Sequence, residues 1–287
     1  MGIQWFPGHM AKTRQQIKRD LGLVDIVIEI LDARIPASSR NPDISSMAKG
    51  KPRLIILNKS DLADPALTSD WEGFFLKKTG FPALAADSLN GKGIRRVPGM
   101  VQKLIAKRMS ALALSGRRPR PARCMVVGIP NVGKSYFINK LAGRNVARTE
   151  DKPGITRGRQ WIRAAGGLDL MDTPGVLWPK FADATVSFRL AATGAIKGDI
   201  YDPYDVACHL LGWIMQNYPH ALRQRYKITE EFPVEEAEML QVIGKTRGLL
   251  LAGGKVDATK VAQVFLKEFR SGRLGRFTME APEDHQV

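Results

Sequence analysis

Two observations predict an α/β fold with a mainly parallel sheet, helices on both faces of the sheet and a small all-α domain after it. Short apolar runs alternate with helical stretches through most of the 287-residue chain, which is typical of parallel βαβ units. Beyond about Tyr204, only helical apolar spacing remains. We therefore expect one domain over residues 1–200 and a helical domain over residues 201–287. Its acidic tail from Met279 is expected to be mobile.

The individual elements follow from apolar spacing. The predicted strands share short β-rich apolar runs, and they lie at 24–31, 53–57, 81–85, 124–127 and 168–171. The predicted helices share apolar residues three or four positions apart, and they lie at 9–22, 71–78, 100–114, 134–141, 205–217, 234–243 and 257–271. The first of these helices is basic. A basic, proline-broken segment over 115–121 is predicted to be a linker.

The segment Gly128–Ser135, Gly-Ile-Pro-Asn-Val-Gly-Lys-Ser, has the sequence of a phosphate-binding P-loop between a strand and a helix. In such a loop, backbone N–H groups converge on phosphate oxygens at a helix N-terminus, where the helix dipole favours negative charge. We expect Lys134 to reach the β- and γ-phosphates as a catalytic residue and the Ser135 hydroxyl to bind Mg²⁺. The residues expected to contact the phosphates are Pro130, Asn131, Val132, Gly133, Lys134 and Ser135.

The segment Asp172–Gly175, Asp-Thr-Pro-Gly, follows an apolar strand, as a metal-side motif should. We expect Asp172 to hold a Mg²⁺-bound water and the Gly175 N–H to meet the γ-phosphate. Thr156, in a Gly-rich stretch between this motif and the P-loop, is expected to complete the Mg²⁺ shell as a catalytic switch threonine. The alternatives are an ordinary turn for the first motif and a mobile loop for the second.

A guanine-recognition box is predicted at Asn58-Lys59-Ser60-Asp61, directly after an apolar strand. The Asp61 carboxylate can accept hydrogen bonds from guanine N1 and N2, which adenine does not offer. Lys59 would lie along the ring, and Asn58 would tie the loop back to the P-loop. A backbone contact to guanine O6 is expected from the loop after the next strand, at Ala86, Asp87 and Ser88.

The order of these motifs indicates a circularly permuted P-loop GTPase domain. In an ordinary GTPase the guanine box follows the P-loop, whereas here it precedes the P-loop. The strands that usually follow Gly175 are therefore at the front of the chain, and residues 176–200 lead into the C-terminal helices instead. We expect any movement of this switch to pass to those helices, so that affinity for RNA depends on the bound nucleotide.

Three residues bear on the rate of GTP hydrolysis. Val176 stands where many GTPases place a Gln that orients water, so we expect the free enzyme to be slow. His9, in an aromatic segment shaped by Gly and Pro, is a candidate for orienting that water; its alternative is a surface or packing role. Asn131 is a candidate ligand of a K⁺ ion beside the phosphates; its alternative is to cap its own loop.

The composition indicates a polyanionic partner. The net charge is +16 and the isoelectric point about 10.0. No uninterrupted apolar run approaches the ~20 residues that span a bilayer, so RNA is favoured over a membrane. Cys124 and Cys208 are expected to be buried thiols. The alternative for each cation is a solvated surface; the candidate phosphate contacts are Arg117, Arg118, Arg120, Arg123, Arg223, Arg225, Lys227, Lys245, Arg247, Lys260, Lys267, Arg270, Arg273 and Arg276.

These motifs resemble those of the circularly permuted GTPases of the YlqF/YawG group. The matching segments are Trp5–Met10, Asp32–Pro36, Asn58–Asp61, Gly128–Ser135, Asp172–Gly175 and Ala192–Ile196. The resemblance implies a cytoplasmic, monomeric factor that acts late in assembly of the large (50S) ribosomal subunit. Such a factor binds the immature particle and its 23S rRNA through a helical tail, and the particle stimulates its slow hydrolysis of GTP to GDP. The guanine-contact loop Ala85–Ser88 departs from the usual Ser-Ala-Lys sequence of GTPases.

Other functions compete with this hypothesis. One is a constitutive RNA-binding scaffold whose nucleotide site is only structural; hydrolysis that increases with ribosomal particles would exclude it. A GTPase of tRNA modification or metal transport is disfavoured by the lack of a membrane span and of a Cys-rich site. An ATPase or nucleotide kinase is disfavoured by Asp61.

Overall fold

The chain forms two compact units. A computed structural model describes residues 10–147, 161–173, 175, 183–196 and 198–285. One unit is α/β and contains the described residues up to Gly175 together with the C-terminal Thr278–His285. The other is helical and contains the described residues between Asp183 and Phe277.

The α/β unit is built on a six-stranded sheet with the order β3-β2-β1-β4-β6-β5. The strands are β1 (Ile26–Asp32), β2 (Arg53–Asn58), β3 (Ala83–Ala85), β4 (Ala122–Gly128), β5 (Trp161–Ala164) and β6 (Leu168–Asp172). All neighbours are parallel except β5 and β6, which confirms the expected mainly parallel sheet. The edge strand β5 was not predicted, because its four residues, alternately exposed and buried, form no apolar run.

The register of the sheet brings the predicted motifs together at the carboxyl ends of its strands. Asp32 pairs with Asn58 across β1 and β2, and Ile30 pairs with Gly128 across β1 and β4. On the other side of β4, Val126 pairs with Asp172. The carboxyl ends of these parallel strands therefore meet where α/β sheets bind their ligands.

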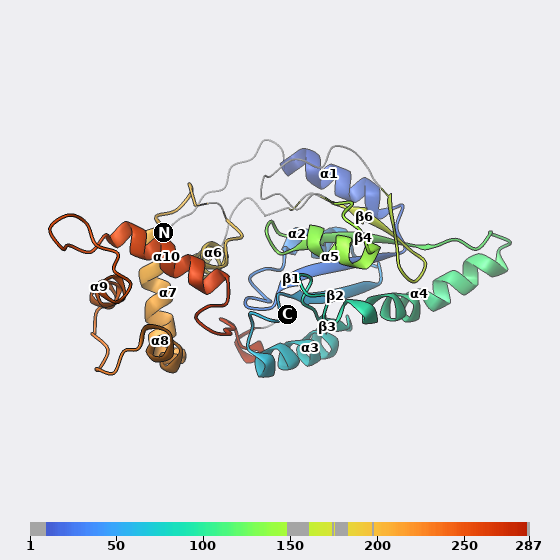
Figure 1. Cartoon of the computed structure of the whole chain (residues 1–287). Helices are drawn as coiled ribbons and strands as arrows, with labels where there is room; N and C mark the ends of the chain where they lie inside the picture. The colour runs from blue at the N-terminus through green and yellow to red at the C-terminus, as the bar shows by residue number, and fades with distance from the viewer. Residues whose placement is uncertain (1–9, 148–160, 174, 176–182, 197, 286–287) are drawn as a thin grey trace. The chain divides into compact units, whose positions relative to one another are not determined.

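Helices cover both faces of this sheet, as expected; α3 and α1 lie on opposite sides of it in Figure 1. The helical elements of the α/β unit are α1 (Met10–Leu21), α2 (Pro42–Met47), α3 (Pro65–Thr79), η1 (Ile94–Arg96), α4 (Val97–Leu114), α5 (Lys134–Ala142) and η2 (Pro282–Asp284). Helix α3 begins earlier than its apolar spacing indicates. The Asp64 carboxylate caps it by accepting from the Ala66 and Leu67 N–H groups, and Pro65 suits the first turn.

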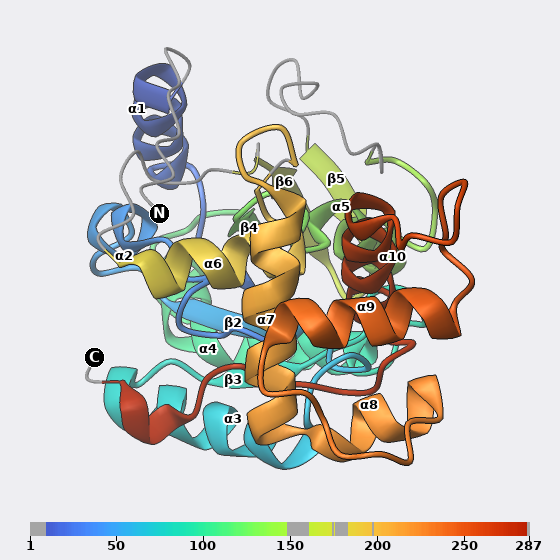
Figure 2. The same cartoon turned by 90° about the vertical axis from the view of Figure 1, so that its left-hand side faces the viewer.

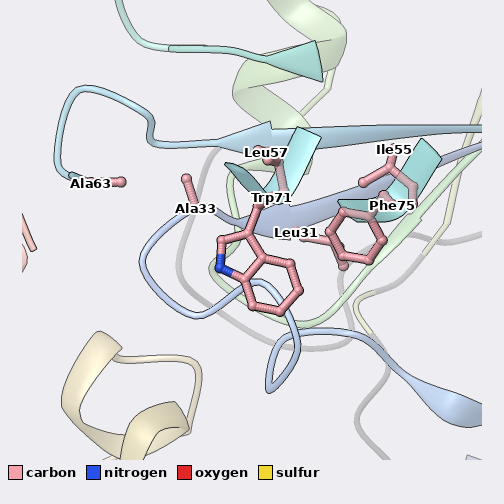
Figure 3. Close-up of a cluster of buried hydrophobic side chains, with 7 residues drawn as sticks. All are labelled: Leu31, Ala33, Ile55, Leu57, Ala63, Trp71 and Phe75. Atoms are coloured by element: carbon pink, nitrogen blue, oxygen red, sulfur yellow. The ribbon is translucent and has the colours of Figure 1, made fainter. Parts of the chain in front are cut away.

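A hydrophobic cluster fixes α3 against the sheet (Figure 3). Trp71 and Phe75 of α3 pack on Leu31 of β1 and on Ile55 and Leu57 of β2, and all five side chains are buried. Because Trp71 is 0 % exposed, truncating it to Ala would cost about 3–5 kcal/mol. This packing holds the loop before α3, which carries the predicted guanine box.

The C-terminal segment is part of the α/β unit, so the prediction of a mobile tail from Met279 is wrong for the described residues 279–285. Glu280 is 2 % exposed, and its carboxylate accepts hydrogen bonds from the Ala37 and Ser38 N–H groups at 2.7 and 3.0 Å. Its carbonyl accepts from Trp71 Nε1 at 3.0 Å. Acidic composition alone could not reveal these acceptors, because their donors lie more than two hundred residues away in the sequence.

The helical unit consists of α6 (Ala184–Thr193), α7 (Pro203–Asn217), α8 (Pro219–Tyr226), α9 (Glu236–Thr246) and α10 (Ala258–Arg270), seen together in Figure 2. Helix α10 packs on α7 and α9, burying Val261, Phe265 and Phe269 as their spacing predicts. Arg270 Nε and Nη2 donate to the Ala192 and Ala191 carbonyls at the end of α6. Because α6 packs within this unit, the unit begins before the boundary at residue 200 that we expected.

Candidate nucleotide site

The P-loop turns between β4 and α5 in a conformation that requires glycine. Gly133 has a φ of 97°, and a Cβ added there would lie 2.3 Å from Asn58 Nδ2. A Cβ added at Gly128 would lie 2.6 Å from the Ile30 carbonyl oxygen. Asn131 also has a positive φ, of 56°, which Asn tolerates better than most residues. The two glycines thus allow the close backbone approach that phosphate binding needs.

Lys134, the first residue of α5, is drawn into the loop. Its Nζ donates to the Gly128 and Ile129 carbonyls at 3.2 and 2.8 Å, and the residue is 8 % exposed. Burial lowers the pKa of Lys134 to about 8, a shift that the carboxylate of Asp172 opposes and the charge of Lys59 reinforces. The site therefore holds a cation that lacks full compensation, and a phosphate group would supply it.

The second phosphate-side motif lies against this loop. Thr173 Oγ1 donates to the Val126 carbonyl at 2.6 Å, which fixes the end of β6 beside β4. A Cβ added at Gly175 would lie 2.9 Å from both Lys134 Nζ and Pro130 Cα, so only glycine fits there. The structure thus brings Gly175 to the P-loop, as its predicted contact with the γ-phosphate requires.

The oxygen groups available here suit a hard cation. Burial raises the pKa of the Asp172 carboxyl, and the charge of Lys134 opposes that rise. Asp172 ends β6 and Ser135 is the second residue of α5, so a carboxylate and a hydroxyl border the same loop. Within the described ranges, no group of three or more His, Cys, Asp or Glu could hold a metal. This donor set fits Mg²⁺, which is bound by few protein ligands together with phosphate and water oxygens. Two predicted catalytic residues, His9 and Thr156, lie outside the described residues.

The guanine box is joined to the P-loop through Asn58. Asn58 Nδ2 donates to the Val132 carbonyl at 2.7 Å, which confirms the expected tie between the two motifs. Asn58 Oδ1 accepts from the Ser88 N–H at 3.1 Å and from the Ser88 hydroxyl at 2.6 Å. The Ser60 N–H donates to the Ala86 carbonyl at 3.1 Å. The loop expected to contact guanine O6 therefore lies beside the box.

Asp87 has another partner within that loop. Its carboxylate accepts from the Leu89 and Asn90 N–H groups at 2.9 and 3.0 Å and from Asn90 Nδ2 at 2.7 Å. This side chain shapes the loop. The Asp87 N–H donates to the Lys92 carbonyl at 2.9 Å and the Ala86 N–H to the Leu57 carbonyl at 2.9 Å, so the donors expected to contact guanine O6 already have protein acceptors.

Asp32 and Arg34 are site-building residues that the sequence analysis left without a role. Asp32 Oδ2 accepts from Lys59 Nζ at 2.9 Å, and the carboxylate binds Arg34 Nε and Nη2 at 2.9 and 2.8 Å. Burial alone would raise the pKa of Asp32, but Arg34 and Lys59 outweigh burial and hold it well below its ordinary value. Lys59 has a φ of 60°, so the ion pair restrains an unfavourable backbone. The feature of the sequence that could have predicted this role is that Asp32 ends the predicted strand that precedes the guanine-box strand.

Several predicted RNA contacts are occupied by protein groups. Arg225 and Arg247 bind the buried Glu268 carboxylate, and Arg120 binds Asp25. Arg270 caps α6, and Arg223 donates to the Glu230 carbonyl. Among the described residues, the predicted contacts that are exposed and form no ion pair with a carboxylate are Arg117, Arg118, Lys227, Lys245, Lys260, Lys267 and Arg273.

Comparison with known proteins places this site in a family. Residues 123–244 match the protein family described as 50S ribosome-binding GTPase. The chain is 46 % identical to ribosome biogenesis GTPase A of Bacillus cereus over 99 % of its own length and 95 % of that relative. It is 47 % identical to the Bacillus licheniformis protein of that name, over 99 % and 100 %. The chain belongs to the ribosome biogenesis GTPase A family.

Solved structures of similar proteins support the fold of this ribosome biogenesis GTPase A family member. The GNP-bound YlqF from T. maritima aligns with a TM-score of 0.64 at 27 % identity, covering 95 % of this chain and 99 % of that one. A GDP-bound YlqF aligns with a TM-score of 0.63, covering 94 % and 100 %. In the part of the chain that the structure describes, no helix is both long and apolar enough to cross a membrane.

Proposed function

We propose that this protein binds and hydrolyses GTP and acts in the cytoplasm at a late step of large ribosomal subunit assembly. The observation that carries the proposal is the hydrogen bond from Asn58 Nδ2 to the Val132 carbonyl, 2.7 Å long. It joins a guanine-selective box and a phosphate-binding loop into one site, in a chain of the ribosome biogenesis GTPase A family. A nucleotide bound there meets Asp61 at its base and Lys134 at its phosphates.

Different residues of the site have different roles in GTP hydrolysis. Lys134 supplies positive charge to the β- and γ-phosphates, and the Gly175 N–H meets the γ-phosphate. Ser135, Thr156 and, through a water, Asp172 would hold Mg²⁺, which would supply positive charge against the phosphates. This arrangement stabilises charge but contains no Gln after Gly175 to orient water, so turnover is slow until the particle completes the site.

GTP turnover with and without purified large ribosomal subunits tests the proposal, with ATP as the control nucleotide. We expect slow hydrolysis of GTP by the protein alone, faster hydrolysis with subunits and none of ATP above background. Turnover that is indifferent to the subunits would contradict the assembly role. Equal use of ATP would contradict the guanine site.

His9 and Asn131 are proposed to raise the rate. His9→Ala is expected to lower subunit-stimulated turnover and to leave GTP affinity unchanged, because its role is to orient water. Asn131 is proposed to bind K⁺ beside the phosphates, so turnover should be faster in potassium than in sodium buffer. An unchanged stimulated rate in His9→Ala, or equal rates in the two salts, would remove the respective role.

We propose that 23S rRNA contacts the exposed lysines of the helical unit. Lys260 and Lys267 lie two turns apart on α10, on the side opposite the buried Val261 and Phe265. Lys245 is exposed on α9, which packs against α10. None of these three forms an ion pair with a described carboxylate, so their charges remain available to phosphate.

The α/β unit offers a second basic surface for RNA. Residues 88–149 contain fourteen Lys and Arg and no Asp or Glu. Arg95 and Arg96 of η1 and Lys103 and Lys107 of α4 are exposed, and η1 packs against α4. Because this stretch of sequence contributes cations and no carboxylates, it favours a polyanion.

The salt dependence of rRNA binding tests these contacts. In the double variant Lys260→Ala/Lys267→Ala, the slope of log affinity against log salt should fall by about one for each lysine. The matched control is Lys77→Ala/Lys78→Ala, which removes two exposed lysines from α3. An unchanged slope in the first variant would exclude α10 from the RNA contact.

The circular permutation is also expected to make the affinity for RNA depend on the bound nucleotide. Residues 176–182 connect Gly175 to the helical unit in the sequence. A switch that rearranges with the γ-phosphate would therefore transmit a conformational change to that unit. We expect the particle to bind the GTP-analogue form and the GDP form with different affinities. Identical affinities would contradict this coupling.

A further inference from the structure

Residues Thr278–Glu280, close to the C-terminal end of the described chain, form a short segment, called the strap here, that bonds to two loops of the α/β unit. Thr278 Oγ1 accepts from the Asp64 N–H at 3.1 Å and donates to the Ala33 carbonyl at 3.4 Å. The next residue, Met279, donates its N–H to the Arg34 carbonyl at 2.7 Å. Strap residues thus bond to the loop after β1 and to the loop before α3.

Glu280 makes the strongest of these contacts. Its carboxylate accepts from the Ala37 and Ser38 N–H groups at 2.7 and 3.0 Å and also from the Ser38 hydroxyl. Its carbonyl accepts from Trp71 Nε1 at 3.0 Å. Hydrogen bonds to a charged, buried acceptor are the strong class, and losing the carboxylate would leave its three donors without this acceptor.

Of the two loops that the strap joins, the loop before α3 carries the guanine-recognition side chains, and the loop after β1 supports it. Asp64 follows Asp61 by three residues, and the Ala33 N–H donates to the Asn58 carbonyl at 2.8 Å. In the loop after β1, the Asp32 N–H donates to Ser39 Oγ at 3.0 Å. Asp32 in turn binds Lys59 at 2.9 Å. Hydrogen bonds therefore link the strap to Lys59 by way of Asp32, and the strap holds Asp64, three residues along the chain from Asp61.

We propose that Thr278 and Glu280 are positioning residues for guanine recognition. They touch no nucleotide, and they act by holding Lys59 and Asp61 where the base is bound. The inference rests on the proposed guanine site and assigns a role in it to a segment at the opposite end of the sequence. Base selectivity then depends on the strap, while the phosphate contacts of the P-loop do not.

The test compares the affinities of the full-length variant Glu280→Ala for GDP and for inosine diphosphate, which lacks the guanine 2-amino group. We expect GDP to bind roughly five- to tenfold more weakly, which is less than the full value of a hydrogen bond to a charged group because the strap acts on the base contacts only through other residues. The ratio of GDP to inosine diphosphate affinity should fall as well, because a displaced Asp61 loses its bond to the 2-amino group. Glu283→Ala, which removes an exposed carboxylate of η2, is the matched control and should leave both affinities unchanged.

Thr278→Val supplies a milder second variant in case Glu280→Ala does not fold. It keeps the side-chain shape and removes the hydroxyl that bonds to Asp64 and Ala33, so the same shift of the ratio is expected at a smaller size. An unchanged ratio in a folded strap variant would overturn the proposal, including the case in which both nucleotides lose affinity equally. Such parallel losses would show a merely structural strap.

Asp61→Asn in the same assay separates this inference from the proposed function. If Asp61→Asn leaves GDP affinity intact, the proposed guanine site itself fails. If Asp61→Asn weakens GDP binding and Glu280→Ala changes neither affinity nor ratio, the site stands and only the strap's role is rejected.

Discussion

The phosphate side and the base side of the proposed site are built in opposite ways. The phosphate side is one contiguous segment, Gly128–Ser135, whose backbone turns between β4 and α5 on glycines that no other residue could replace. The base side is assembled from four separate segments, listed in chain order as 32–38, 58–61, 86–88 and 278–280. Backbone groups can recognise phosphate locally, whereas selecting a base requires side chains held by distant contacts.

Lys134→Ala should have the largest effect, because it removes the only side-chain cation assigned to the phosphates. We expect GTP turnover to fall by about 10²–10³-fold, the usual loss when a charge-stabilising donor is removed. Lys140→Ala, exposed on the same helix, is the control. If Lys134→Ala keeps the GTP turnover of the natural protein in the presence of large subunits, Lys134 does not act on the phosphates.

Asp61→Asn should break the base side while the phosphate side stays intact. GDP affinity should fall roughly ten- to hundredfold, because a charged acceptor for two donors is lost. Xanthosine diphosphate should bind better than before, since the amide can donate to the oxygen that replaces the 2-amino group. Asp70→Asn, exposed on α3, is the control for calorimetric titrations with both nucleotides. Unchanged preference for guanine would mean that Asp61 does not face the base.

The pH dependence of binding should report the phosphate side alone. With the pKa of Lys134 lowered to about 8 in the free protein, the lysine is charged below pH 8 in both the free and the bound states. Above pH 8 it must take up a proton to bind phosphate, so GDP affinity should fall by up to about tenfold per pH unit.

Lys134→Arg is the control for that titration, since Arg stays charged throughout this range. Its GDP affinity should be flat where the affinity of the natural protein falls. If both proteins show the same slope between pH 7 and pH 9, a group other than Lys134 controls the titration.

Ser88→Ala should have the smallest effect and sharpen the picture of the base side. It removes the hydroxyl that donates to Asn58 Oδ1 at 2.6 Å, while the Ser88 N–H still donates to the same oxygen at 3.1 Å. One net hydrogen bond of about 1 kcal/mol corresponds to a two- to tenfold loss of GDP affinity. Ser115→Ala, exposed at the end of α4, should change nothing.

The parts predicted correctly are those whose cause is local. The β-rich run before Asn58 and the glycines of the P-loop predict their own backbone, so β2 and the turn into α5 agree with expectation. The edge strand β5 was missed because four residues of alternating exposure carry little signal. The ion pair of Asp32 with Lys59 was missed because it depends on strand register, which the sequence does not show.

The sequence by itself determined the P-loop, the guanine box, their reversed order and the mainly parallel sheet, because periodicity and turn chemistry act between neighbours along the chain. Only the tertiary structure decided that acidic Glu280 is a buried acceptor and that Arg225, Arg247 and Arg270 bind protein groups. The physical reason is that a buried charged side chain needs a hydrogen-bonding or oppositely charged partner. Only the folded structure determines which group lies close enough to be that partner.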